Sequence, residues 1–158
     1  MKKILTTTFL TVLACFMLQA AVFGQARDTR LGIGVAYDGK VEGAGLQVNA
    51  LFPVSAEFDI APDITFYFPD NFDHYVAFNI DGHYLLTAEP EYLVYALGGL
   101  NLTTFQYKHV DNSDSKLGIN VGIGGEYHLE GFSVFGDLKY ILSDFDRVVL
   151  ALGARFPI

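Results

Sequence analysis

The chain contains long stretches in which apolar and polar residues alternate one by one. From Glu57 to Phe68, every even-numbered position is apolar, whereas Glu57, Asp59 and Asp63 on the odd-numbered positions carry three carboxylates. A period of two residues is that of a β-strand with one apolar and one polar face. This segment is therefore predicted to be an amphipathic strand.

Seven other segments of similar length show the same alternation, and no helix-length amphipathic segment interrupts them. Segment 92–103 is apolar on both faces, so its orientation is ambiguous from the pattern alone. We take its outer set to be Tyr92, Val94, Ala96, Leu100 and Leu102. The predicted strands are 30–38, 43–52, 57–68, 75–86, 92–103, 116–127, 132–142 and 147–158.

The connections between the predicted strands alternate in character. Those after the second, fourth and sixth strands are short turns, whereas 38–42, 69–74, 104–115 and 143–146 are more polar and mostly longer. An even number of strands of about ten residues, joined alternately by turns and loops, is typical of a transmembrane β-barrel. The sequence thus predicts an all-β fold, an eight-stranded antiparallel up-and-down barrel. Because a closed barrel has no edge strand to hold a proline, we expect a bulge at Pro62.

Aromatic residues occur at matching positions of these strands. On the face assigned as outward, seven positions nearest the short turns are aromatic, as an interfacial girdle at a membrane surface requires. A soluble β-sandwich has no reason to align them in this way. The predicted girdle consists of Phe52, Phe58, Tyr84, Tyr92, Tyr127, Phe132 and Phe156.

The N-terminus has the pattern of a secretory signal peptide. Basic residues at the start precede an apolar run, and Gly24 and Ala26 provide a small-x-small cleavage site. We expect cleavage after Ala26, which leaves residues 27–158 as the barrel domain. An uncleaved anchor is the alternative, but the apolar run is short for a membrane span and is interrupted by Gln19 and by threonines.

Cys15 raises a second alternative, because the residues before it resemble a lipoprotein processing site. Leu13 is large where a small residue is usual, and the residues after Cys15 stay apolar. Cleavage after Ala26 removes the only cysteine, which excludes disulfides from the mature chain. It also removes two lysines, so that eight basic residues face eighteen acidic ones, a net charge of −10. This charge argues against nucleic acid as a partner.

The pattern resembles a known family of membrane proteins. The signal peptide, the eight alternating strands and the terminal segment Leu150–Ile158 are similar to small outer-membrane β-barrel proteins related to OmpX and the OmpA transmembrane domain. The resemblance implies a monomeric protein of the bacterial outer membrane, non-enzymatic, with lipid as its surroundings and a role in adhesion, surface interaction or envelope integrity. It also implies that the barrel-assembly machinery reads the last strand, in which Phe156 precedes a terminal Ile158.

Charged residues on the inward face must lie within a narrow barrel that its own side chains fill. Buried charges have to pair or become neutral. We expect Arg155 near Glu57, Asp59 and Glu126, and Lys139 near Asp63 and Asp137. A structural plug is the first interpretation. A proton- or cation-binding lumen is the alternative, because six inward acids face the three inward bases Lys139, Arg147 and Arg155. The predicted network is Glu57, Asp59, Asp63, Asp81, Glu126, Asp137, Lys139 and Arg155.

No motif points to catalysis, a metal or a cofactor. His74 and His109 fall in predicted loops, His128 in a turn and His83 on the inward face, and none has a serine at the spacing of a nucleophilic pair. Segment 111–114 is rich in oxygen ligands but lacks the spacing of a calcium loop. Two other functions remain as alternatives. One is a soluble lipocalin-like barrel that binds an apolar ligand, and the other is an outer-membrane enzyme that modifies lipid A.

Overall fold

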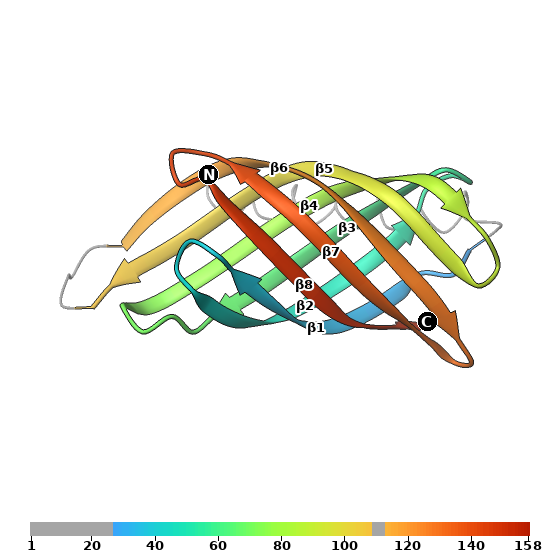
Figure 1. Cartoon of the computed structure of the whole chain (residues 1–158), viewed down its shortest axis with the longest axis horizontal. Coiled ribbons are helices and arrows are strands. Elements are labelled where there is room, and N and C mark those ends of the chain that lie inside the picture. Colours follow the sequence, from blue (N-terminus) through green and yellow to red (C-terminus); the bar gives the residue numbers. More distant parts are fainter. Residues whose placement is uncertain (1–26, 109–112) are drawn as a thin grey trace, which may run out of the picture.

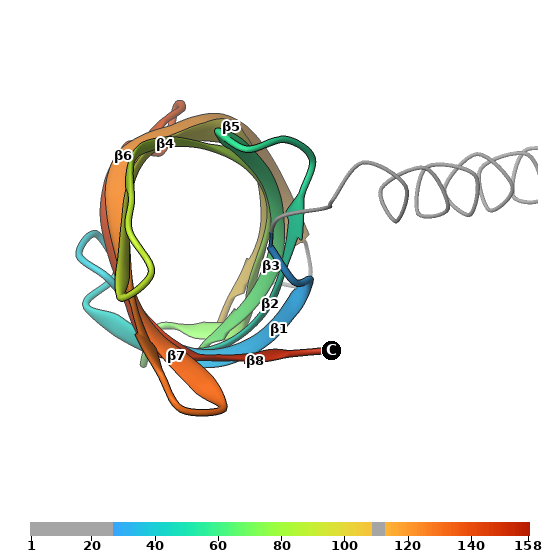
Figure 2. The same ribbon diagram turned by 90° about the vertical axis from the view of Figure 1, so that its right-hand side faces the viewer.

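The computed structural model describes residues 27–108 and 113–158, which form eight antiparallel strands. The strands follow one another in sequence order around the sheet, and β8 pairs with β1 to close a barrel (Figure 1, Figure 2). The predicted eight-stranded up-and-down barrel is therefore confirmed. The strands are β1 Arg30–Asp38, β2 Gly43–Pro53, β3 Phe58–Tyr67, β4 Phe72–Ala88, β5 Tyr92–Tyr107, β6 Ser113–Leu129, β7 Phe132–Leu142 and β8 Arg147–Pro157.

The two ends of the barrel differ in their connections. The turn end holds the connections 54–57, 89–91 and 130–131, together with the start of β1 and the end of β8. The loop end holds the connections 39–42, 68–71 and 143–146 and the tip of the β5–β6 hairpin. Gly131 has a φ of 84° in the shortest turn, a conformation that glycine adopts without steric cost.

The closing ladder explains why no edge strand remains along β1. Arg30 to Asp38 pair with β2 from Leu51 to Gly43 on one side and with β8 from Pro157 to Val149 on the other. Each backbone polar group of this strand can therefore find a partner within the sheet, as a lipid environment requires.

Strands β4, β5 and β6 are longer than the sequence predicts. They have 16 or 17 residues, whereas the other five strands have 9 to 11. The predicted loops 69–74 and 104–115 are therefore wrong in extent. Polar composition indicated a loop there, but Thr104 and Ser115 pair across the β5–β6 ladder and their hydroxyl oxygens lie 3.0 Å apart. Figure 1 shows this hairpin reaching beyond the β1–β2 and β7–β8 connections.

Pro62 is accommodated without the bulge that the sequence predicts. The β3–β4 ladder runs without a shift through the pair Pro62–Ile80. Against β2, the pairs opposite Ala61 and Pro62 are absent, yet the register is the same on both sides of this gap. The strand thus gives up local pairing on the side where proline has no N–H to donate. Register shifts occur elsewhere, on β4 between Phe72 and His74 and between Leu85 and Thr87.

Apolar side chains cover the outside of the barrel. Ile33, Ile80, Leu100 and Leu117 are each more than 60% exposed, and their sequence neighbours on the opposite parity are turned inward. The outward set chosen for segment 92–103 is confirmed, since Tyr92, Val94, Leu100 and Leu102 are exposed while Leu93, Tyr95 and Leu97 are buried. The lipocalin-like alternative required apolar faces that point inward, and the structure contradicts it. An apolar surface of this extent fits lipid, not water.

Residues 1–26 lie outside the described residues, so the signal peptide, its cleavage after Ala26 and the role of Cys15 remain predictions. His109 and Asp111 are also outside them. Within 27–108 and 113–158, no helix has the length and hydropathy to cross a membrane.

Candidate functional site: the barrel lumen and its turn end

Both rims of the apolar surface carry aromatic side chains. At the turn end, all seven predicted girdle residues lie on the outward parity, and the ladder places Phe58 opposite Tyr84 and Tyr92 opposite Tyr127. Phe132 and Phe156 stack, with their ring centroids 6.0 Å apart. A second set of exposed aromatic residues, which the sequence pattern did not predict, lies on the outward parity toward the loop end: Tyr37, Phe66, Phe68 and Tyr140.

The separation of the two rims suits a bilayer. On β3, eight residue steps separate Phe58 from Phe66. At a rise of about 3.3 Å per residue and a tilt of about 40°, these steps span about 20 Å along the barrel axis. The apolar band of an outer-membrane barrel is about 25 Å tall, so one ring of aromatics near each rim lies at the level of a membrane interface.

The lumen receives seven of the eight residues of the predicted network, and Glu57 is the exception. Glu57 lies in the β2–β3 turn and is exposed, because β3 begins one residue later, at Phe58. The prediction that Glu57 belongs to the lumen network is therefore wrong. Asp59, the other predicted carboxylate at the start of β3, does lie in the lumen and is 1% exposed.

Sequence reasoning missed three charged groups of this network. Arg27 precedes β1 and pairs with Asp59. Arg30 and Asp38 are the first and last residues of β1, and both are buried. The alternation in β1 could have predicted that Arg30 and Asp38 face inward, because they lie on the same parity as Gly32, Gly34 and Ala36. Arg27 had no such signal, because it precedes the strand.

At the turn end, the buried Arg155 connects four other strands. Its Nη1 donates to Glu126 Oε2 on β6 at 2.7 Å, and its Nε donates to Asn49 Oδ1 on β2 at 3.0 Å. Asp137 on β7 lies 3.8 Å from its Nη2 and accepts a 2.5 Å hydrogen bond from Tyr95 of β5. This cluster, the Arg155 tier, ties opposite walls of the barrel together.

Lys139 forms a second tier, further from the turn end along β7. Its Nζ lies 3.0 Å from both Asp63 Oδ2 on β3 and Asp81 Oδ2 on β4. Asn120 donates to Asp81 Oδ1 at 2.6 Å, and Asn79 donates to Asp63 Oδ1 at 2.8 Å. The expected contact of Lys139 with Asp63 is present, and its second partner is Asp81 in place of Asp137.

Arg147 forms the third tier, near the loop end. Its Nε lies 2.9 Å from Asp38 Oδ2, and its Nη2 donates to Thr103 Oγ1 at 2.5 Å. Asp38 also accepts a 2.7 Å hydrogen bond from the Tyr75 hydroxyl. Beyond this tier, buried aromatic rings fill the lumen; Tyr67 and Tyr75 pack edge to face with their centroids 5.1 Å apart.

Charges in the lumen nearly balance. The described residues place six carboxylates and five cations inside, whereas the sequence suggested six acids against three bases. Near balance removes the excess of negative charge that motivated the cation-binding alternative. The groups are Asp38, Asp59, Asp63, Asp81, Glu126 and Asp137 with Arg27, Arg30, Lys139, Arg147 and Arg155.

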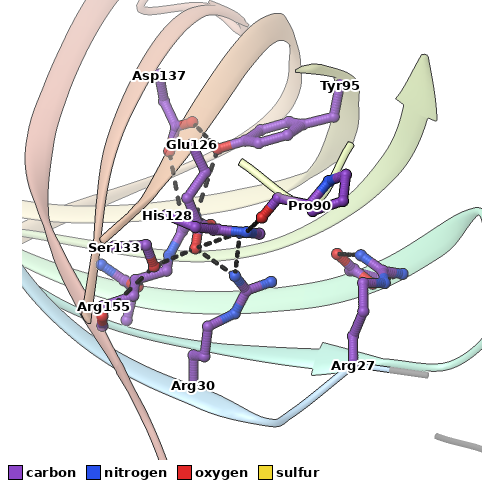
Figure 3. Close-up of polar contacts among 11 residues, drawn as sticks. Arg27, Arg30, Pro90, Tyr95, Glu126, His128, Ser133, Asp137 and Arg155 are labelled. Atoms are coloured by element: carbon purple, nitrogen blue, oxygen red, sulfur yellow. Dashed lines mark hydrogen bonds and ion pairs between the residues drawn. The ribbon is translucent and has the colours of Figure 1, made fainter. Parts of the chain in front are cut away.

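Figure 3 shows the polar contacts at the turn end. Arg27 binds Asp59 through two hydrogen bonds of 2.6 and 2.8 Å. Arg30 Nη1 bonds to Glu126, and it lies 3.0 Å from His128 Nε2. His128 Nδ1 lies 3.0 Å from the Pro90 carbonyl oxygen. A carbonyl can only accept, so Nδ1 carries the proton and Nε2 accepts from Arg30.

Ser133 lies opposite His128 in the β6–β7 ladder, a neighbour that the sequence spacing did not reveal. The hydroxyl of Ser133 donates to Glu126, and no described histidine accepts its proton. A nucleophilic serine needs a base that takes this proton and an acid behind the base. Here the carboxylate binds the serine directly and is itself held by two arginines. Among the described residues, no group of three His, Cys, Asp or Glu side chains could hold a metal ion.

Comparisons with known proteins agree on the fold. No protein-family model matches the sequence, and no curated protein matches it either. Solved structures do match. The N-terminal β-barrel domain of Pseudomonas aeruginosa OprF superposes with a TM-score of 0.71 at 14% identity, covering 83% of this chain and 97% of that one.

Two further structures are similar. A major outer membrane protein from Thermus thermophilus gives a TM-score of 0.66 at 16% identity, over 83% of this chain and 98% of that one. Ail, the attachment invasion locus protein of Yersinia pestis, gives 0.60 at 15% identity, over 84% and 100%. The shared closed barrel and the apolar exterior of this chain lead to the same conclusion. The chain has the fold of the small eight-stranded β-barrels of the bacterial outer membrane.

Proposed function

We propose that this protein is a sealed, non-enzymatic barrel that contributes to the integrity of the outer membrane. The observation that carries the proposal is the set of three tiers in the lumen. Arg155, Lys139 and Arg147 each contact a strand that is not a neighbour of their own: Arg155 contacts Glu126 of β6, Lys139 contacts Asp81 of β4, and Arg147 contacts Thr103 of β5. Side chains that meet across the lumen fill the space that a channel would need.

In this proposal the turn end faces the periplasm, because short turns lie on that side in outer-membrane barrels. Residues 1–26 act as the cleaved signal peptide, and the barrel-assembly machinery reads β8, on which Phe156 faces outward. The protein works as a monomer. These points rest on the sequence pattern and on the family resemblance.

The absence of enzymatic activity rests on the chemistry at the turn end. Ser133, His128 and Glu126 are close together, but the order of their hydrogen bonds is not that of a nucleophilic relay. His83 is buried in the lumen, where it stacks on Tyr95 with ring centroids 4.2 Å apart, and it does not face the outer surface. Among the described residues, no lipid-facing nucleophile with a base in reach supports the lipid A-modifying alternative.

A second candidate function is interaction at the cell surface, and one observation favours it. Strands β4 to β6 project beyond the other loop-end connections, and Ser113 to Gly118 of β6 pair with β5 only, since the β6–β7 ladder begins at Ile119. Asp114 and Lys116 form a 3.1 Å ion pair on this projection. The lysine and the backbone N–H of Ser115 hold the pKa of the Asp114 carboxyl below its usual value.

The ligand of one similar structure is a poor guide to such a partner. Ail has been crystallised with the heparin analogue sucrose octasulfate, a polyanion. The loop end of this chain exposes Asp70, Asp73, Asp144 and Asp146, which outnumber the exposed lysines there, Lys40 and Lys108. These carboxylates would repel a sulfated sugar, so a partner here would be neutral or basic.

Cell fractionation with gel mobility tests the proposed location and fold. The protein should partition with the outer membrane and should migrate differently with and without boiling, as a folded barrel does. Deletion of its gene should then raise sensitivity to detergents and bulky antibiotics. Recovery from the soluble periplasm, without a mobility shift, would contradict the proposal. An unchanged barrier in the deletion strain would favour the surface-interaction candidate.

A further inference from the structure

Strand β6 has one open edge at its loop-end tip. From Ser113 to Leu117 it pairs with β5 on one side, but the β6–β7 ladder begins only at Ile119, so the other side has no strand partner among the described residues. The outward face carries Leu117 and then, toward the tip, Ser115 and Ser113, all of them exposed. The change from apolar residues to serine indicates that the tip lies outside the lipid. An exposed strand edge of this kind is a template for pairing with another chain.

The backbone hydrogen bonds of β6 show which groups point to this open edge. In an antiparallel ladder, the N–H and C=O of one residue bond to the same neighbouring strand, and successive residues alternate between the two sides. His128 N–H donates to the carbonyl oxygen of Glu91, so the even-numbered residues of β6 bond toward β5. The β5–β6 register has no shift along the whole ladder. The odd-numbered Ser113, Ser115 and Leu117 therefore direct their N–H and C=O groups toward the open edge.

The side chains of the same segment are complementary in charge to a second copy of themselves. Asp114 and Lys116 lie on one face of β6, where they form a 3.1 Å ion pair. If a second β6 pairs antiparallel, with Ser115 opposite Ser115, each Asp114 faces the Lys116 of the other copy. The next registers on either side place Asp114 opposite Asp114 or Lys116 opposite Lys116, and like charges that face each other are destabilising. The register centred on Ser115 joins opposite charges and also pairs the backbone groups of the odd-numbered residues.

The symmetry of such a pair determines where the second copy lies. Two antiparallel copies of one strand are related by a two-fold axis perpendicular to their sheet. The barrel wall stands upright in a membrane, so this axis lies in the membrane plane and reverses the barrel axis of the second copy. The second barrel therefore lies in an opposing membrane. Figure 1 shows β5 and β6 reaching past the other loop-end connections, where a molecule on another membrane can approach them.

We propose that the open edge of β6 binds the same edge of a second copy in an opposing membrane, so that the protein joins two cells that carry it. Within one membrane the chain stays a monomer, because the β6 strands of its barrels all run from the loop end to the turn end. The contact is smaller than a stable protein interface, and many copies between two membranes strengthen it through avidity. The segment 113–117 is neutral, since Asp114 and Lys116 cancel. Salt screens the repulsion between the aspartates elsewhere at the two loop ends.

This inference rests on the proposed location in the outer membrane and names a partner for the surface-interaction candidate. For its test, residues 27–158 would be reconstituted into two populations of phospholipid vesicles that carry differently coloured lipids, in about 0.15 M salt. The gel mobility shift first establishes that the barrel is folded. Labelling of Asp144→Cys by a membrane-impermeant maleimide reports the fraction of loop ends outside, since these residues contain no other cysteine. Coincidence of the two colours then measures clustering. We expect wild-type vesicles to cluster with one another and not with protein-free vesicles.

Charge reversal tests the register. Asp114→Lys and Lys116→Asp should each lower clustering between vesicles of the same variant by about fivefold or more, because both facing pairs become like charges. Vesicles of Asp114→Lys mixed with vesicles of Lys116→Asp should cluster again, since each lysine then faces an aspartate. Asp73→Lys on β4, away from the open edge, is the matched control and should cluster as the wild type does.

Ser115→Pro tests the backbone contact. The N–H of Ser115 points to the open edge, so proline costs no bond to β5, and proline is tolerated on edge strands in this orientation. The variant loses the central hydrogen bonds between the two copies, and its clustering should fall about tenfold or more. Ser115→Ala keeps the N–H and should cluster as the wild type does.

Wild-type vesicles that stay separate, although their barrels are folded with loop ends outside, would overturn this inference and leave the sealed barrel untouched. Clustering that persists in Ser115→Pro would place the contact on another surface and would also overturn it. The same holds if the two charge variants fail to cluster when mixed. Clustering with protein-free vesicles would show that the loop end binds lipid instead of a second copy. A chain without a gel mobility shift would reject the proposed function itself.

Discussion

The two faces of the same strands are organised by different rules. On β3, Ile60 and Ile64 face outward and need only to be apolar, because lipid accepts any such side chain. Asp59 and Asp63 face inward four residues apart, yet they bind Arg27 and Lys139, which lie at different places in the chain. The exterior thus requires only that each outward residue is apolar, whereas the lumen requires particular acidic and basic residues to meet.

This difference has an energetic consequence. Each outward residue contributes through its own transfer into lipid, so substitutions there should be nearly additive. The lumen groups share partners: Glu126 is held by both Arg30 and Arg155, and Asp81 by both Lys139 and Asn120. Removal of one member leaves another charge buried without its partner, and the cost should depend on what else is present.

The largest effect is expected for Arg155→Leu. This substitution leaves Glu126 with one arginine and removes the arginine beside Asp137, and both carboxylates are buried. We expect the free energy of unfolding to fall by about 3–5 kcal/mol, as for other broken buried pairs. Urea unfolding in lipid vesicles, followed by gel mobility, measures it.

The double variant Arg155→Leu with Glu126→Gln is the control for this prediction, because it removes the stranded carboxylate as well. It should lose less stability than the sum of the two single variants. Strict additivity of the two substitutions would show that the Arg155 tier does not act as a coupled network.

A charge on the outer face is expected to have the next largest effect. Leu152, in the middle of β8, is 52% exposed to the surroundings of the barrel. Leu152→Arg should cost about 2–4 kcal/mol if this position lies near the bilayer midplane. Leu152→Ile is the control and should cost less than about 1.5 kcal/mol. A tolerated arginine, with unchanged unfolding in vesicles, would mean that this surface does not face lipid.

The sequence predicted the outer face of the strands better than the lumen. The exterior was predictable, because parity alone places Phe58, Tyr84 and Tyr127 outward. Lumen partners were less accessible: Lys139 was expected near Asp137 but contacts Asp81, since the stagger of the closed sheet decides which strands face each other. The polar residues Thr104 and Ser115 led to the prediction of a loop, but they lie in strands, because strands that extend beyond the membrane also carry polar residues.

Glu57 and Asp59 allow a direct comparison of an exposed and a buried carboxylate, because they have the same charge and lie two residues apart. Asp59 is buried against Arg27, whereas Glu57 is exposed in the turn. Asp59→Asn should cost about 1.5–3 kcal/mol, the range of a hydrogen bond to a charged group. Glu57→Gln should stay within about 0.5 kcal/mol of the parent chain, as most surface changes do. Equal costs in urea unfolding would contradict the placement of the strand start.

The most direct test of the central claim, that the apolar face meets lipid while the charged face fills the lumen, uses fluorescence. The chain has no tryptophan, so a single introduced tryptophan gives a clean signal. Ile80→Trp lies on the outer face and Phe135→Trp in the lumen, beneath Arg155. In vesicles with lipids brominated near the middle of the acyl chain, Ile80→Trp should be strongly quenched and Phe135→Trp several-fold less. Quenching of Phe135→Trp alone, or of neither variant in a folded barrel, would contradict the account.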